Sequence, residues 1–296
     1  MQSRILQKNL LELVRRTSAE LPPDVIRTIE KGYRQEAPDS NAKYALKVVL
    51  DNIKLARNKS QPLCQDTGTI ICYAELPAWQ KEEAFRRAFD AAVAQATAVG
   101  YLRQNSVDSI TGKNSGNNLG PGSPVYHFSP AKGRTMTVRV ILKGGGCENM
   151  GIQYSLPDGR VGAGRDLAGV RLCLLDAVHL AQGKGCGPGI LGVCVGGDRA
   201  TGYVASKEEF FRKLDDVNPD PRLAKVEKQV LQETNELGIG PMGFGGRTTL
   251  LGCKITHRNR LPASFFVSVS YMCWAFRRNG CQMTEAGKVT RWLYED

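Results

Sequence analysis

The sequence has 296 residues, enough for one large domain or two small ones. Hydrophobic residues make up 42% and charged residues 23%, which excludes a disordered or collagen-like chain. Lys and Arg number 40 against 29 Asp and Glu, a formal net charge of +11, so an anionic ligand, an acidic partner or nucleic acid is favoured.

The sequence contains no apolar run that approaches the roughly 18–20 residues of a membrane span. The N-terminal segment is interrupted by charges and lacks the apolar core of a signal peptide. We therefore expect a cytoplasmic protein with no membrane association. Nine cysteines, an odd number without a secretory signal, argue against a disulfide framework and predict reduced thiols.

Apolar residues at helical spacing predict three helices at the start of the chain. Their predicted positions are 2–20, from Pro22-Pro23 through Ile29, and about 41–57 with Ser40 or Asn41 as the cap. A buried strand is predicted at 69–74 and an alanine-rich helix at about 80–99. Residues 101–124 form a long Gly/Asn/Ser loop, and loops of this length are usually functional or disordered.

Strand-like alternation returns at 135–142 and stops at Lys143-Gly144-Gly145-Gly146. Beyond it, the pattern predicts helix, strand, helix and strand at about 164–182, 189–195, 222–237 and 264–272. The sequence shows no repeat, linker or clear boundary. It therefore predicts one α+β domain over 1–296, in which a mostly helical segment (1–58) precedes mixed helices and sheets.

Several familiar motifs are missing from the sequence. It has neither a phosphate-binding G-x-x-x-x-G-K-[ST] loop nor a C-x-x-C pair. The segment 238–243 matches G-x-G-x-x-G by letter, but it follows a predicted helix rather than a strand, so a dinucleotide site is not expected there. Three histidines are too few for most zinc enzymes.

The cysteines fall into two local contexts. Cys72 and Cys194 lie in apolar runs, where cysteine commonly acts as a small hydrophobic residue. Cys64 and Cys186 lie in polar or glycine-rich turns, and Cys273 ends a predicted strand. Three loop thiolates can hold a four-iron cluster with one iron open to substrate. From spacing alone, nine unrelated thiols remain the alternative.

Four motifs, in order, resemble the class I fumarate hydratases and their tartrate dehydratase relatives. They are Pro62-Leu63-Cys64-Gln65-Asp66-Thr67-Gly68, Lys143-Gly144-Gly145-Gly146, Gly185-Cys186-Gly187-Pro188 followed by Val195-Gly196-Gly197, and Ser270-Tyr271-Met272-Cys273-Trp274-Ala275-Phe276-Arg277-Arg278. These landmarks extend from about residue 40 to 280, and Cys-Gln-Asp-Thr-Gly is the most specific of them.

The resemblance implies an oxygen-sensitive [4Fe–4S] cluster whose open iron binds a hydroxy acid and whose ligands are Cys64, Cys186 and Cys273. It also implies substrate contacts from Gln65, Asp66, Arg103 and the backbone around Gly146. The residue types suit these roles: an arginine can hold a carboxylate through two hydrogen bonds, and a carboxylate such as Asp66 can act as the catalytic proton donor or hold a water.

The sequence departs from the family pattern in two places. Single-chain members continue into a second domain that supplies a catalytic threonine, a lysine and further arginines, whereas this chain ends at Asp296. The chain therefore resembles a separate α subunit, expected to be active only with a β subunit in an αβ or α2β2 complex. The stretch 260–264 also lacks the family's histidine, and His257, just upstream, is its candidate replacement.

The leading interpretation is a hydro-lyase of the tricarboxylic acid cycle that reversibly hydrates fumarate to (S)-malate. Tartrate dehydratase and mesaconate hydratase α subunits are the alternatives within the same class. A basic nucleic-acid-binding iron–sulfur protein is the alternative from another class, but the basic residues are scattered and no nucleic-acid-binding signature occurs, so no nucleic acid is expected. A regulatory or assembly subunit without a cluster is the third alternative.

Overall fold

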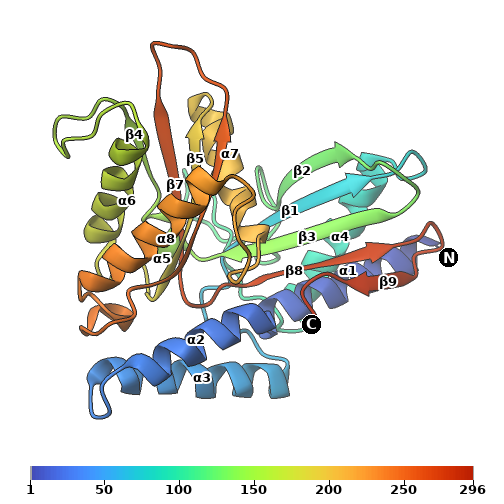
Figure 1. Cartoon of the computed structure of the whole chain (residues 1–296). Coiled ribbons are helices and arrows are strands. Elements are labelled where there is room, and N and C mark those ends of the chain that lie inside the picture. Colours follow the sequence, from blue (N-terminus) through green and yellow to red (C-terminus); the bar gives the residue numbers. More distant parts are fainter. Residues whose placement is uncertain (1, 296) are drawn as a thin grey trace. The chain divides into compact units, whose positions relative to one another are not determined.

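The computed structural model describes residues 2–295 and has a mixed α+β fold, as the sequence predicts (Figure 1). The chain forms two compact units. The first contains 2–23, 51–145 and 277–295, and the second contains Asp24–Leu50 and Gly146–Phe276. Because each unit is assembled from separate segments, no linker marks the division. A single catalytic domain over 1–296 stays a prediction.

The three predicted opening helices are confirmed as α1 (Gln2–Ala19), α2 (Pro23–Gln35) and α3 (Asn41–Lys59). Helix α2 begins at a proline, whose missing N–H costs nothing in a first turn. Helix α3 follows Ser40, whose hydroxyl accepts a hydrogen bond from the Lys43 N–H at 3.1 Å. Within residues 2–295, no helix is both long and apolar enough to cross a membrane.

The first unit contains a five-stranded sheet in the order β2-β1-β3-β8-β9. Its strands are β1 (Thr69–Leu76), β2 (Val125–Pro130), β3 (Met136–Lys143), β8 (Arg278–Met283) and β9 (Val289–Trp292). Strand β1 runs parallel to β2 and antiparallel to β3. Strand β1 is the predicted buried strand, and β3 confirms the strand predicted at 135–142.

Two helices pack with this sheet to form the core of the first unit. Helix α1 contacts α4 (Glu82–Ala98) as well as β3 and β8. The cluster includes Leu13 of α1, Phe85 and Phe89 of α4, Cys72 of β1 and Val138 of β3, and each has 0% of its surface exposed. The structure has no helix or strand between α4 and β2, so the loop predicted at 101–124 is confirmed.

The second unit contains a four-stranded sheet in the order β4-β7-β5-β6. Its strands are β4 (Ile152–Ser155), β5 (Gly189–Gly196), β6 (Leu250–Arg258) and β7 (Phe266–Met272). The remaining elements are α5 (Gly145–Glu148), α6 (Leu167–Ala181), α7 (Arg199–Glu208), α8 (Pro221–Glu236) and two 3-10 turns, Glu209–Phe211 and Pro241–Gly243. Helix α6 contacts α8, α8 contacts β6, and α7 contacts β5 and β7.

Aspartates cap helices α6, α7 and α8 of this unit. Asp166 accepts from Gly169 N before α6, Asp198 from Ala200 N and Thr201 N before α7, and Asp220 from Arg222 N before α8. In β5, a Cβ on Gly192 would lie 2.2 Å from the Ser206 carbonyl oxygen. Glycine at this position therefore lets the backbone of α7 approach the sheet closely.

Candidate active site

A cavity of about 740 Å³ opens in the first unit where three loops meet. The loops are the Cys64–Gly68 segment before β1, the segment after α4, and the glycine run after β3. The lining residues are Gln65, Asp66, Gly68, Thr69, Leu102, Arg103, Gln104, Asn105 and Gly145. Gln65, Asp66 and Arg103, which the sequence singled out as substrate contacts, thus line one pocket.

Close backbone packing brings the first and third of these loops together. Gly68 has a φ of +79°, and a Cβ there would lie 2.4 Å from the carbonyl carbon of Lys143. Only glycine fits both constraints. As a result, Asp66 Oδ2 accepts a hydrogen bond from the Gly145 N–H at 2.7 Å, which orients the carboxylate at the pocket.

Two buried side chains fix the Arg103 segment beside the Asp66 loop. The Arg103 N–H donates to Thr67 Oγ1 at 3.2 Å, and the Asn118 amide donates to the Arg103 carbonyl at 2.7 Å. Asn118 Oδ1 also accepts from the N–H groups of Asn105 and Ser106 at 2.8 and 3.1 Å. The backbone of Arg103 is therefore held while its side chain stays exposed.

Asn105 links the same two loops from the pocket side. With its amide oriented to satisfy its neighbours, Asn105 Oδ1 accepts from the N–H groups of Thr67 and Gly68 at 2.8 and 3.1 Å. The positioning roles of Asn105, Asn118 and Thr67 were not predicted from the sequence. Thr67 alone of the three could have been, because it lies in the Cys-Gln-Asp-Thr-Gly motif.

The other predicted contact, the backbone around Gly146, lies at the start of α5. Gly145 lines the pocket and donates to Asp66, whereas Gly146 belongs to the second unit. Cys64 immediately precedes Gln65 and is half-buried. His257, the candidate replacement for the family histidine, is exposed near the end of β6.

In the second unit, the loops that carry Cys186 and Cys273 touch each other. The Trp274 N–H donates to the Cys186 carbonyl at 3.3 Å. The ring of Tyr271 packs on the glycine turn around Cys186, because a Cβ on Gly185 or Gly189 would lie 2.4 or 2.2 Å from that ring. These glycines make room for an aromatic side chain beside both cysteines.

The backbone and burial around this pair are unusual. Cys186 has a φ of +54°, a conformation that costs a non-glycine residue energy and often occurs at functional sites. Burial raises the pKa of the Tyr271 hydroxyl well above its usual range, and the nearby thiols of Cys273, Cys147 and Cys186 raise it further.

The remaining six cysteines are buried in the described structure, consistent with a packing role: Cys72, Cys147, Cys173, Cys194, Cys253 and Cys281. The predicted core positions of Cys72 in β1 and Cys194 in β5 are confirmed. Burial raises the pKa of Cys194 to about 11 and that of Cys173 to about 12, so both thiols stay protonated at neutral pH.

Comparison with known proteins places this geometry in context. The family description "Fumarate hydratase (Fumerase)" matches residues 7–282. This chain belongs to the fumarate hydratase family. It is 49% identical over 295 residues to the "Putative fumarate hydratase class I" of Geobacillus stearothermophilus, covering 98% of this chain and 57% of that relative. The chain therefore spans little more than half of that relative's length.

Two further relatives in this family are named as α subunits. The "Putative L(+)-tartrate dehydratase subunit alpha" of Methanocaldococcus jannaschii is 31% identical over 276 residues, which cover 91% of this chain and 94% of the relative. The "L(+)-tartrate dehydratase subunit alpha" of Escherichia coli K12 is 28% identical over 264 residues, which cover 88% and 85% of the two chains.

The donor set suits a cluster of the kind the family resemblance implies. Cys64 and Cys186 are half-buried in the described chain, and Cys273, which is buried, lies in the loop bonded to that of Cys186. Thiolates are the ligands that iron–sulfur clusters require. Among residues 2–295, no group of three or more His, Cys, Asp or Glu side chains is already assembled in metal-binding geometry.

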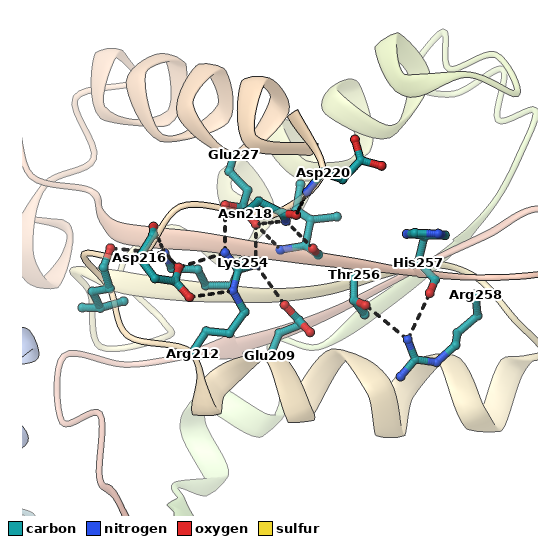
Figure 2. A network of polar contacts seen from close by, with 12 residues as sticks. Glu209, Arg212, Asp216, Asn218, Asp220, Glu227, Lys254, Thr256, His257 and Arg258 are labelled. Carbon is teal, nitrogen blue, oxygen red and sulfur yellow. Dashed lines mark hydrogen bonds and ion pairs between the residues drawn. The ribbon is translucent and has the colours of Figure 1, made fainter. Parts of the chain in front are cut away.

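The second unit also contains a dense polar network (Figure 2). Buried Glu227 accepts hydrogen bonds from Arg212 Nη1, Asn218 Nδ2 and the Ile255 N–H, each at 2.7 Å. Lys254 Nζ donates to Asp216 Oδ1 at 2.6 Å and to the Leu214 and Asp216 carbonyls at 3.2 and 3.1 Å. These groups are paired with one another, which indicates a structural role in this family member.

Proposed function

We propose that this chain is the α subunit of an iron–sulfur hydro-lyase that interconverts fumarate and (S)-malate together with a β subunit. The observation that carries the proposal is the pocket in which Gln65, Asp66 and Arg103, all from the family's motifs, meet the N–H of Gly145. It combines a carboxylate with a guanidinium beside a loop cysteine, as a hydroxy-acid site requires.

Each residue has a role that follows from its chemistry. The exposed guanidinium of Arg103 binds one substrate carboxylate through parallel hydrogen bonds. Asp66, oriented by the Gly145 N–H, holds or delivers the proton that the substrate hydroxyl takes up when it leaves as water. Gln65 and the backbone N–H groups near Gly146 complete the polar lining.

Cys64, Cys186 and Cys273 are the residues that would hold the [4Fe–4S] cluster. When bound, such a cluster supplies a Lewis-acidic iron that polarises a hydroxyl or carboxylate oxygen. Two of the other thiols, those of Cys72 and Cys194, lie inside strands β1 and β5 and pack in the sheets, whereas Cys64 and Cys186 lie in loops and Cys273 directly follows β7.

A β subunit is proposed because two relatives that the chain covers to 94% and 85% are named as α subunits. The net charge of +11 fits a dianionic substrate and an acidic partner surface. We further propose that the complex is a cytoplasmic αβ or α2β2 hetero-oligomer.

L-Tartrate dehydration is the second candidate function, favoured by the two tartrate dehydratase relatives. The fumarate relative has the higher identity, 49% against 31% and 28%. Family membership favours either hydro-lyase, or a mesaconate hydratase, over a nucleic-acid-binding protein.

The test is anaerobic co-purification with the β subunit, iron and sulfide analysis, and a panel of fumarate, L-tartrate and mesaconate. We expect turnover of fumarate to exceed that of the other two acids. A cluster-loaded complex that turns over none of the C4 and methyl-C4 dicarboxylates contradicts the hydro-lyase proposal. Preferred turnover of L-tartrate selects the second candidate.

Cysteine variants test the ligand assignment independently of substrate. Cys64→Ser, Cys186→Ser and Cys273→Ser should each reduce bound iron and sulfide, whereas Cys72→Ser and Cys194→Ser should retain them. The reverse pattern would show that the assigned ligands are wrong.

A further inference from the structure

The long loop between α4 and β2 contains a hairpin, residues 106–115, that the proposed chemistry does not use. The Ser115 N–H donates to the Ser106 carbonyl at 2.9 Å, and the Asp108 N–H donates to the Lys113 carbonyl at 2.9 Å. Apart from Ser106, every residue of the hairpin is exposed. Loops of this length are usually functional or disordered, and the hydrogen-bonded hairpin favours a function.

The tip of the hairpin is fixed by the carboxylate of Asp108. Its Oδ1 accepts hydrogen bonds from the Thr111 N–H at 2.7 Å, Thr111 Oγ1 at 2.8 Å and the Ile110 N–H at 3.1 Å. These bonds lower the pKa of Asp108 below its ordinary value, so the carboxylate stays ionised at neutral pH. Gly112 follows with a φ of +69°, which closes the turn without strain. The backbone at Ile110 is thus held by bonds within the hairpin itself.

This ordered tip presents apolar side chains to solvent. Ile110 is 93% exposed, the highest value among the large hydrophobic residues that the structure describes, and Val107 of the same hairpin is 55% exposed. Single exposed hydrophobic residues are common on protein surfaces and need no partner. Two of them on one hydrogen-bonded hairpin are different, because the ordered backbone holds both in water. Contact with a second protein would remove this apolar surface from water.

The hairpin is joined to the rim of the proposed active-site pocket. Arg103, Gln104 and Asn105, which shortly precede it in the chain, all line the cavity. The Asn114 amide of the hairpin donates to the Gln104 carbonyl at 2.8 Å. A protein that completes this pocket must approach its rim, and the hairpin is attached there.

We propose that the hairpin 106–115 is a docking element for the β subunit, with Ile110 buried in an apolar socket on that subunit. This inference rests on the proposed function, which requires a β subunit at the pocket. A second copy of this chain fits less well, because both copies would carry the same net charge of +11. Lys113 is exposed on the hairpin, so the matching surface is an apolar socket with an acidic side chain beside it.

The test measures, by calorimetry, the Kd between the purified β subunit and the full-length chain. Ile110→Ser should weaken binding about 10- to 100-fold, because the burial of one isoleucine side chain is lost. Val217→Ser is the matched control: Val217 is 80% exposed but lies in the second unit, so the Kd should not change. Because neither side chain is buried within this chain, both variants should keep the wild-type thermal midpoint.

A second pair of variants tests whether the shape of the tip contributes. Asp108→Ala removes the acceptor that holds the N–H groups of Ile110 and Thr111, so the tip must be ordered on binding and the Kd should rise about 3- to 10-fold. Asp108→Asn is its matched control, because an asparagine oxygen makes the same turn, and its Kd should stay within about 2-fold of wild type. At saturating β subunit, all variants should reach the wild-type kcat.

The outcomes separate this inference from the proposed function. If the wild-type chain binds the β subunit and Ile110→Ser binds it equally well, or if Ile110→Ser and Val217→Ser lose affinity alike, the inference alone is overturned. It is also overturned if saturating β subunit does not restore kcat, or if sedimentation shows that Ile110→Ser only dissociates a dimer of this chain. A complex that forms through Ile110 but turns over no dicarboxylate rejects the proposed reaction and supports the docking role. If the wild-type chain binds no β subunit, both proposals fail.

Discussion

The polar network around Glu227 and the pocket lined by Asp66 differ in how their charged side chains are paired. Around Glu227, the guanidinium of Arg212 and the ammonium of Lys254 find carboxylate and carbonyl oxygens at 2.6–3.2 Å (Figure 2). In the pocket of the first unit, by contrast, the side chain of Arg103 is exposed and the half-buried Asp66 carboxylate accepts a hydrogen bond from the Gly145 N–H. Charges paired inside the protein stabilise the fold, whereas the charges that line the pocket are accessible to a ligand. We therefore expect substitutions in the Glu227 network to change stability and substitutions in the Asp66 pocket to change activity.

The electrostatics of the paired region support this interpretation. Burial alone would raise the pKa of Asp216, but its hydrogen bonds to Arg212 and Lys254 lower the pKa below the ordinary value. The Asp216 carboxylate is thus stabilised in its charged form by neighbours that are already present. No ligand is required for this balance.

The largest expected effect is on kcat, from a substitution in the pocket lined by Asp66. Asp66→Asn should lower kcat by about 10²–10⁴, because a positioned acid or base is lost. The asparagine Oδ1 can still accept the Gly145 N–H, so the thermal midpoint and iron content should stay near wild type. A variant that keeps more than a tenth of wild-type kcat would remove Asp66 from the chemistry.

The second prediction concerns the polar network around Glu227. Glu227→Ala should lower the free energy of unfolding by about 3–5 kcal/mol, because it leaves Arg212 and Asn218 without a shared buried acceptor. Denaturant unfolding measures the change. Glu83→Ala, which removes an exposed helix ion pair with Arg87, is the control and should shift the midpoint little. Equal effects from the two variants would contradict a structural role for Glu227.

The third prediction concerns the positioning of Arg103. Asn118→Ala should cost about 1–3 kcal/mol of stability, because two N–H groups and the Arg103 carbonyl lose their partner. It should also raise KM more than it lowers kcat, because the role proposed for Arg103 is to bind a substrate carboxylate rather than to act on the reacting bond. Asn117→Ala, which removes one exposed side-chain hydrogen bond to the Leu119 N–H in the same loop, is the matched control. An unchanged KM would show that Asn118 does not position Arg103.

The smallest expected effect is the pH dependence of the stability that Asp216 contributes in the Glu227 network. Because the folded-state pKa of Asp216 is lowered, its contribution to the free energy of unfolding is present above the ordinary aspartate pKa of 3.8 and is lost as the pH falls through the folded-state pKa. The difference in unfolding free energy between wild type and Asp216→Asn should therefore shrink from pH 6 to pH 3. Asp215→Asn is the control, since the Asp215 side chain is 55% exposed. A difference that grows on acidification would reverse the assigned sign.

The sequence predicts elements well where periodicity is simple. Helices α1 and α3 and the apolar strand β5 lie within a few residues of their predicted bounds. Strand β8 was missed because its sequence, Arg-Asn-Gly-Cys-Gln-Met, is polar, although Arg278 and Cys281 are fully buried. The sequence does not predict helix α7, because Gly202 disfavours a helix and few apolar residues mark a buried face; the Asp198 cap was its one signal.

The candidate site was predictable only where residues stand in a recognisable motif. Gln65, Asp66 and Arg103 were named from such motifs and line one pocket. Asn118 was not, because its role depends on a chain fold that brings it to Thr97 and Arg103. Arg277 stands in the last of these motifs, but its burial could not be predicted, because an arginine in sequence is most simply taken as exposed and burial is a property of the fold.

The most direct test of the dicarboxylate pocket is a crystal structure of the cluster-loaded αβ complex with succinate bound. We expect one carboxylate of succinate on Arg103 beside Asp66, and the cluster on Cys64, Cys186 and Cys273. Succinate bound away from Asp66 and Arg103, or a cluster held by any of the six core cysteines, would contradict the account.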